Sequence, residues 1–309
     1  MSTDNRVAAS SPAGSIYDLG YRHYEGKRRG HWFAAWSLYV DSLRGIWGFG
    51  RPMSAKAAPF ILAGLYALPA VVVLAFSSTI SKSIATGETN PLDLPNYANY
   101  FGGIGTFIVL FLVAQAPEVV CRDQRYQVLP LYFTRAMGRF DYAMARLLSL
   151  ATALFLVLMV PMIALFIGDI LMSADAFKAI GNELPTALPT IPSNLLIAAS
   201  MASIALALSS YSPRRAYAAV GLLAYFLLVE FVPLVIYGIG HEAGAKWVDY
   251  LPLITPITGL SRATDWFFGA PIPSDFSSSV GAGAYVLAGF VSMLLFTGIL
   301  VWRYRRIAA

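Results

Sequence analysis

The sequence is poor in charge and has almost no cysteine. Only 13% of its 309 residues are charged, whereas 57% are hydrophobic, and a soluble domain is expected to be about a quarter charged. The single cysteine, Cys121, leaves no pair for an internal disulfide. The composition therefore excludes a soluble or disulfide-stabilised domain and predicts an integral membrane protein.

Several catalytic and ligand-binding motifs are also missing. The chain has neither a G-x-x-x-x-G-K-[ST] loop, which would cradle a nucleotide phosphate, nor a G-x-S-x-G nucleophile turn. The three histidines, His23, His31 and His241, are scattered, and no Cys/His cluster exists. We therefore expect no metal site, no cofactor and no enzyme active site in this chain.

Six apolar runs are long enough to cross a bilayer, which takes roughly 20 residues. They cover residues 57–80, 101–120, 142–172, 191–210, 216–239 and 280–302. The third is long enough to tilt or to extend beyond the membrane. A further stretch, 251–268, contains Pro252, Pro256, Arg262 and Asp265, and it is predicted to be a re-entrant or surface-lying element on the outer side.

Lys and Arg are divided unevenly between the two sides that these spans define. With the N-terminus inside, 18 of the 22 Lys and Arg residues fall in cytosolic segments, as the positive-inside rule requires. Counting 251–268 as a seventh span would place the C-terminal RYRR sequence outside. The distribution predicts a multi-pass protein of the plasma (inner) membrane with both termini cytoplasmic, and it explains the net charge of +5 without nucleic acid.

The first 56 residues lack the apolar core of a signal peptide, so we expect them to be mature cytosolic protein. Residues 1–15 are predicted to be disordered, and 16–30 are either an extended arm or a basic linker. Residues 31–49 are predicted to form an amphipathic helix along the cytoplasmic leaflet. Its apolar face carries Trp32, Trp36, Tyr39, Val40, Leu43 and Trp47. The expected organisation is this N-terminal region (1–56), a transmembrane domain (57–302) and a short tail (303–309).

Residues 116–146 connect the second and third spans and carry five arginines. Because charged side chains are costly inside lipid, this segment must lie in the cytosol and dock on a partner there. Apolar side chains alternate with charged ones, so a short helix could offer both an apolar anchor and charges that fix its orientation. The candidate contact residues are Glu118, Arg122, Asp123, Arg125, Tyr126, Val128, Leu129, Leu131, Phe133 and Arg135.

Two carboxylates and one small-residue stripe lie within the spans. Glu118 lies near the cytosolic end, where it could pair with Arg122 at i, i+4. Glu230 lies deeper and is followed by Pro233, so it is either a structural partner or a residue that lines a conduit. The stripe of Ala199, Ser203 and Ala207 favours close helix packing, either within the chain or at a dimer face.

The segment PEVVCRDQRYQVLPLYFTRAMGRFDY, together with the order of its flanking elements, resembles the type-2 membrane permeases of ATP-binding-cassette exporters, with an actinobacterial-like N-terminus. The resemblance implies a coupling helix over residues 122–137 that sits in a cleft of the ATPase subunit. One departure is Gln127, which occupies a place where the family often has glycine.

The resemblance implies an all-α fold of six transmembrane helices, with an N-terminal interfacial helix, a cytosolic coupling helix between spans 2 and 3, and an outer re-entrant element before span 6. The implied function is that of a permease subunit exporting a drug, lipid or similar amphipathic molecule. ATP and magnesium would be bound by soluble ATPase partners, and a second permease subunit, a copy or a paralogue, would complete the channel. The alternatives are a secondary transporter or channel that uses Glu118 and Glu230, and a noncatalytic membrane scaffold.

Overall fold

The computed structural model of the chain describes residues 30–85, 97–133, 137–173, 175–269 and 280–306. Within these ranges the chain is helical and has no strand. The elements in order are α1 (His31–Ile46), α2 (Met53–Ala85), α3 (Tyr100–Arg125), α4 (Leu129–Phe133), α5 (Arg139–Met172), α6 (Ala176–Ala187), α7 (Thr190–Ser209), α8 (Arg215–Glu242), the 3-10 helix η1 (Lys246–Ile254), α9 (Pro256–Phe268) and α10 (Ala282–Arg306).

Six of the described helical segments are long and apolar enough to cross a membrane, as the six apolar runs predict. They are Lys56–Phe76, Tyr100–Arg125, Arg139–Met172, Ala176–Ser209, Arg215–Glu242 and Ala282–Arg306. Helix α5 has 34 residues, which corresponds to about 50 Å and exceeds the roughly 30 Å of a hydrocarbon core. The predicted 251–268 element consists of the end of η1 and the whole of α9.

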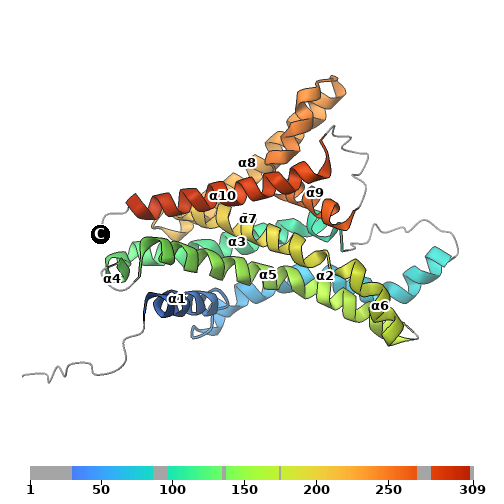
Figure 1. Cartoon of the computed structure of the whole chain (residues 1–309), viewed down its shortest axis with the longest axis horizontal. Helices are drawn as coiled ribbons and strands as arrows, with labels where there is room; N and C mark the ends of the chain where they lie inside the picture. Colours follow the sequence, from blue (N-terminus) through green and yellow to red (C-terminus); the bar gives the residue numbers. More distant parts are fainter. Residues whose placement is uncertain (1–29, 86–96, 134–136, 174, 270–279, 307–309) are drawn as a thin grey trace, which may run out of the picture.

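Helix α7 lies at the centre of the bundle, between α3 and α5 on one side and α10 on the other (Figure 1). Small side chains make this position possible, since Ser203 and Ala207 are fully buried. The Ser200 hydroxyl donates a hydrogen bond of 3.0 Å to the backbone carbonyl of Gly289 on α10. Of the two roles predicted for the small-residue stripe, packing within the chain is therefore the one that the structure supports.

Helix α1 packs along α5 and also contacts α3. Leu38, Ser42 and Ile46 form its buried face, and the Tyr39 hydroxyl donates to Thr152 Oγ1 at 3.1 Å. Trp32 and Trp36 remain 77% and 61% exposed. The predicted apolar face is therefore divided: Tyr39, Leu43 and Trp47 pack against the core, while the first two tryptophans face outward.

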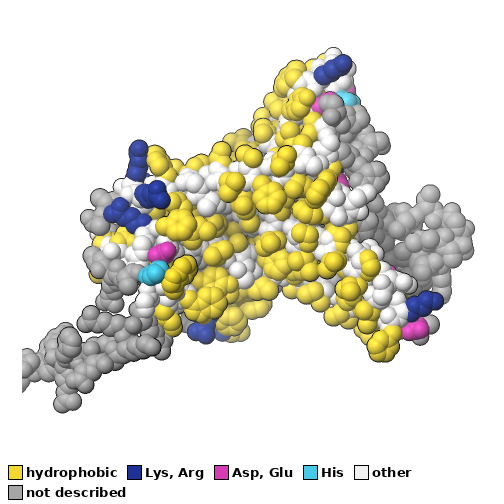
Figure 2. Space-filling model, viewed as in Figure 1, with side chains coloured by type: hydrophobic (Ala, Val, Ile, Leu, Met, Phe, Trp, Pro, Cys, Tyr) yellow, Lys and Arg dark blue, Asp and Glu magenta, His cyan; other side chains and the backbone are white. Residues whose placement is uncertain are grey.

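The two ends of the bundle differ in charge. Figure 2 shows hydrophobic side chains across the middle of the visible face and Lys and Arg side chains near the ends. We call the end that holds α1, α4 and the last residues of α10 the arginine-rich end. Its described basic residues are Arg44, Arg51, Lys56, Arg122, Arg125, Arg139, Arg146, Arg214, Arg215, Arg303, Arg305 and Arg306. The element α9 lies at the opposite end (Figure 1).

Candidate functional site

The segment between α3 and α5 differs from the single helix predicted over residues 122–137. Helix α3 continues to Arg125, so Arg122, Asp123 and Arg125 belong to its last turn. The chain then reverses at Gln127, whose φ of 53° makes it the one non-glycine residue with positive φ in the described ranges. A separate helix of five residues, α4, follows. The continuous helix is therefore wrong, because the left-handed residue ends it.

Most of the predicted contact residues surround this reversal. Arg122, Arg125, Tyr126 and Leu131 are exposed, the last two to 65% each, whereas Val128 and Phe133 are half-buried. Leu129 is only 4% exposed and belongs to the core. A partner could contact Leu131 without any rearrangement, but it could not contact Leu129 in this way. Arg135 lies outside the described residues.

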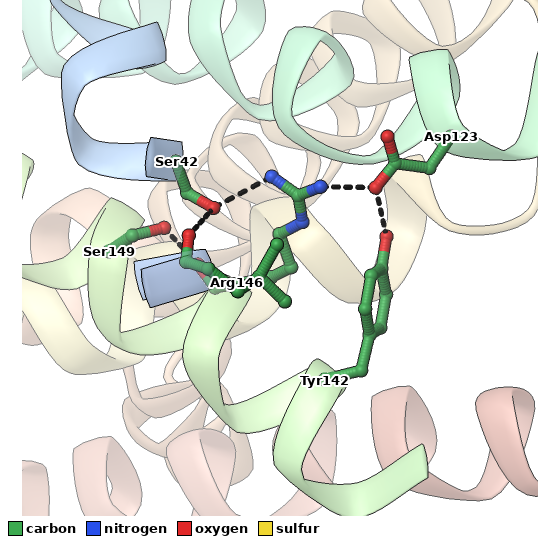
Figure 3. A network of polar contacts seen from close by, with 6 residues as sticks. Ser42, Asp123, Tyr142, Arg146 and Ser149 are labelled. Atoms are coloured by element: carbon green, nitrogen blue, oxygen red, sulfur yellow. Dashed lines mark hydrogen bonds and ion pairs between the residues drawn. The ribbon is translucent and has the colours of Figure 1, made fainter. Parts of the chain in front are cut away.

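Asp123 is buried in a polar network that joins three helices (Figure 3). It forms an ion pair with Arg146 of α5 and accepts a hydrogen bond of 2.7 Å from the Tyr142 hydroxyl. Arg146 also donates from Nη1 to Ser42 Oγ of α1 at 2.7 Å. The network connects the last turn of α3 to α5 and, through Arg146, to α1. Separating α3 from α5 would break a buried ion pair, and moving α1 away would break the hydrogen bond to Ser42.

Sequence reasoning counted Arg146 only as a charge and did not identify Ser42 or Tyr142. A usable signal was present, since Arg146 starts a long apolar run and a buried charge requires a partner. Asp123, at the matching end of the preceding span, was the nearest acidic candidate on that helix. Ser42 carries no such signal, because its burial depends on how α1 packs.

Glu118, at the same end of the bundle, links α3 to two other parts of the chain. Its carboxylate pairs with Arg51, which precedes α2, and with Arg215 at the start of α8, where Nη1 lies 2.9 Å from Oε2. The predicted i, i+4 pair with Arg122 is therefore wrong. Two more distant arginines occupy the carboxylate instead, because the fold brings the starts of two spans against the end of α3.

Glu230 is 6% exposed and binds the first turn of α9. Its carboxylate accepts hydrogen bonds from the backbone N–H of Ile257 at 2.8 Å and of Thr258 at 2.9 Å, and from the Thr258 hydroxyl at 2.5 Å. The carboxylate satisfies amide groups that a helix N-terminus leaves without intrahelical acceptors. Both of its oxygens are engaged in holding α9 against α8.

The described residues contain no group of three or more His, Cys, Asp or Glu side chains that could hold a metal ion. At the arginine-rich end, buried polar contacts tie the last turn of α3, which leads into the exposed reversal, to α1 and α5. Helix α4 contacts α5 through the rings of Tyr132 and Phe133, which lie against Tyr142. Compared with models of known families and with curated proteins, the sequence matches none.

Proposed function

We propose that the chain is the permease subunit of an ATP-binding-cassette exporter, in which the reversal and α4 receive the motion of a soluble ATPase subunit. The observation that carries the proposal is the network of Asp123, Arg146 and Ser42, which ties the last turn of α3, directly before this segment, to α1 and α5. Exposed Tyr126 and Leu131 stand beside it as contact side chains. A buried apolar anchor with charges around it is the usual basis of such a contact.

In this proposal the partner binds ATP and Mg²⁺, and closure of two ATPase subunits pushes on α4. The push reaches the bundle because a buried ion pair resists separation of α3 from α5. Rocking of these helices against the rest, and against a second permease subunit, would open the pathway alternately to each side. The cargo of such a pathway would be an amphipathic molecule such as a drug or lipid.

The proposed orientation places the arginine-rich end, and with it both termini, in the cytosol of a cell whose plasma (inner) membrane holds the bundle. It follows from the unequal distribution of Lys and Arg between the two ends. In this orientation α1 lies at the cytosolic end of the bundle and α9 at the outer end.

The alternative of a secondary transporter that uses its intramembrane carboxylates receives less support. A carboxylate that exchanges protons or ions must be able to change partners, but Glu118 is held by two arginines and Glu230 by three hydrogen bonds. Both are placed to hold helices together.

The test is a charge placed on the exposed anchor. In Leu131→Asp, co-purification of nucleotide-hydrolysing activity with the full chain from its native membranes should fall by at least tenfold, because an apolar interface anchor costs upwards of about 1.4 kcal/mol when lost. Insertion should be unchanged, since the side chain is already 65% exposed. The matched control is Phe177→Asp, at an apolar side chain 90% exposed on α6. Undiminished co-purification with Leu131→Asp would rule the proposal out.

A further inference from the structure

A cavity of about 1110 Å³ opens at the arginine-rich end, between α1, the end of α3 and α4. Its walls carry charges of both signs rather than a continuous apolar surface. The charged side chains that line it are Asp41, Arg44, Arg51, Glu118, Arg122, Asp123 and Arg146. The rim includes exposed Phe49, Tyr126 and Leu131.

The charges within this cavity are not all paired. Glu118 is held by Arg51 and Arg215, and Asp123 by Arg146, as described above. Arg44 of α1 and Arg122 of α3 are exposed, and their side chains form no ion pair or hydrogen bond with the described residues. Asp41 is the one lining acid without such a pair. Two arginines from two different helices therefore face one opening with a single acid left to oppose them.

The wall formed by α1 shows at what depth this opening lies. Exposed Trp32 and Trp36 stand on the same helix as Arg44, and tryptophan in this setting is typical of the layer where lipid headgroups meet the acyl chains. Arg44 follows Trp36 by eight positions, about 12 Å along the helix, so the cavity lies within reach of that level. Arginine pockets between helices at that level bind anionic headgroups.

We infer that this cavity binds the phosphate-bearing headgroup of an anionic phospholipid, with Arg44 and Arg122 on the phosphate. Guanidinium groups suit this role because they donate paired hydrogen bonds to phosphate oxygens. Arg146 adds positive charge at the base, where its Nε is buried and has no hydrogen-bond partner among the described residues.

The site concerns lipid retention, so its test does not depend on transport or on any ATPase. The full chain is reconstituted in phosphatidylcholine vesicles that contain phosphatidylglycerol, extracted in mild detergent, and weighed by native mass spectrometry. The wild type should retain phosphatidylglycerol in preference to phosphatidylcholine. The double variant Arg44→Gln/Arg122→Gln should retain it about 30-fold less, since each arginine at an anionic surface is worth about fivefold in affinity.

The control is Arg305→Gln/Arg306→Gln, which removes the same charge from exposed positions on α10 at the same end but outside the cavity. This control should retain the lipid as the wild type does. Equal loss in both double variants would mean that surface charge alone attracts the lipid, and would overturn the site. Unchanged melting temperatures in both variants establish that the fold is intact, as expected for exposed side chains.

Two other outcomes also overturn the lipid assignment. If inorganic phosphate stabilises the wild type but not Arg44→Gln/Arg122→Gln, and phosphatidylglycerol shows no preference, then the ligand is a soluble anion. If the double variant keeps its phosphatidylglycerol but loses a co-purifying protein, then the arginines serve a protein partner.

Discussion

Two buried carboxylates, Asp123 and Glu230, are stabilised in different ways. Asp123 lies at the arginine-rich end and is neutralised by a cation, Arg146, with help from the Tyr142 hydroxyl. Glu230 lies within α8 and binds no cation in the described structure; backbone amides and a hydroxyl at the start of α9 surround it instead. Their burial is nearly equal, at 8% and 6% exposed.

The difference follows from what each position can supply. Near the end of the bundle, where water is close, a long arginine side chain can reach a buried carboxylate. The carboxylate and the guanidinium then neutralise each other. Deeper in the bundle, a cation would also have to be desolvated, which would add to the free-energy cost of burial. A helix N-terminus avoids this extra cost, because it offers positive partial charge and N–H groups that lack intrahelical acceptors. The first arrangement links side chains of three helices, and the second fixes one helix end to another.

Breaking the ion pair should have the largest effect. Arg146→Met leaves the Asp123 carboxylate buried with one hydroxyl donor, and removal of one partner of a buried pair costs about 3–5 kcal/mol. Thermal unfolding in detergent measures the loss. Replacing both partners, as in Asp123→Leu/Arg146→Met, should recover most of it, because no uncompensated charge remains. A double variant as unstable as the single one would mean that packing, not charge, holds these helices.

Neutralising Glu230 should have a smaller effect. Glu230→Gln keeps one acceptor oxygen but turns an NH₂ group toward an N–H donor of α9, so one buried amide loses its acceptor at a cost of about 1–3 kcal/mol. Hydrogen exchange at the amides of Ile257 and Thr258 should speed up while that of α7 stays slow. The control Glu242→Gln, at the exposed end of α8, should leave exchange unchanged. Unaltered protection in Glu230→Gln would contradict the capping role.

Asp265 of α9 is a third buried acid, and it is only weakly paired. Replacing it should have the smallest effect on stability of the three. Its carboxylate lies 4.0 Å from Arg262 Nη1, and burial raises the pKa of this carboxyl to about 6 although Arg262 opposes the shift. A raised pKa in the folded state stabilises the protein below the unfolded pKa, and this contribution is lost as pH rises through about 6. The wild type should therefore melt higher at pH 5 than at pH 7 by a margin that Asp265→Asn reduces. An equal margin in both proteins would argue against the shift.

The long elements could be predicted from the sequence because their signal is local. The predicted run 191–210 is observed as α7 (Thr190–Ser209), and the run 216–239 lies within α8 (Arg215–Glu242). Twenty consecutive apolar residues decide such a helix by themselves, whatever surrounds them. The length of α4 could not be predicted, because five residues have no periodicity to read and their conformation depends on packing against α5.

The partners of the site residues were beyond sequence reasoning for a related reason. Glu118 forms ion pairs with Arg51 and Arg215, which lie 67 and 97 positions away, and not with Arg122 on its own helix. The choice is made by helix packing, which local spacing does not encode. Gln127 is an instructive exception, since the departure from glycine noted in the sequence marks the residue with a φ of 53°.

The single thiol of the chain has a practical consequence. Cys121 is 1% exposed, and its Sγ lies 3.6 Å from the carbonyl oxygen of Ser209, to which it donates. A thiol sealed in this way reacts with a maleimide only when α3 and α7 come apart, so its rate of modification reports opening of the bundle. Modification of Cys121 in the native sequence can therefore be used to follow unfolding. Spin or fluorescent labels can also be attached to cysteines introduced at exposed positions without first removing Cys121.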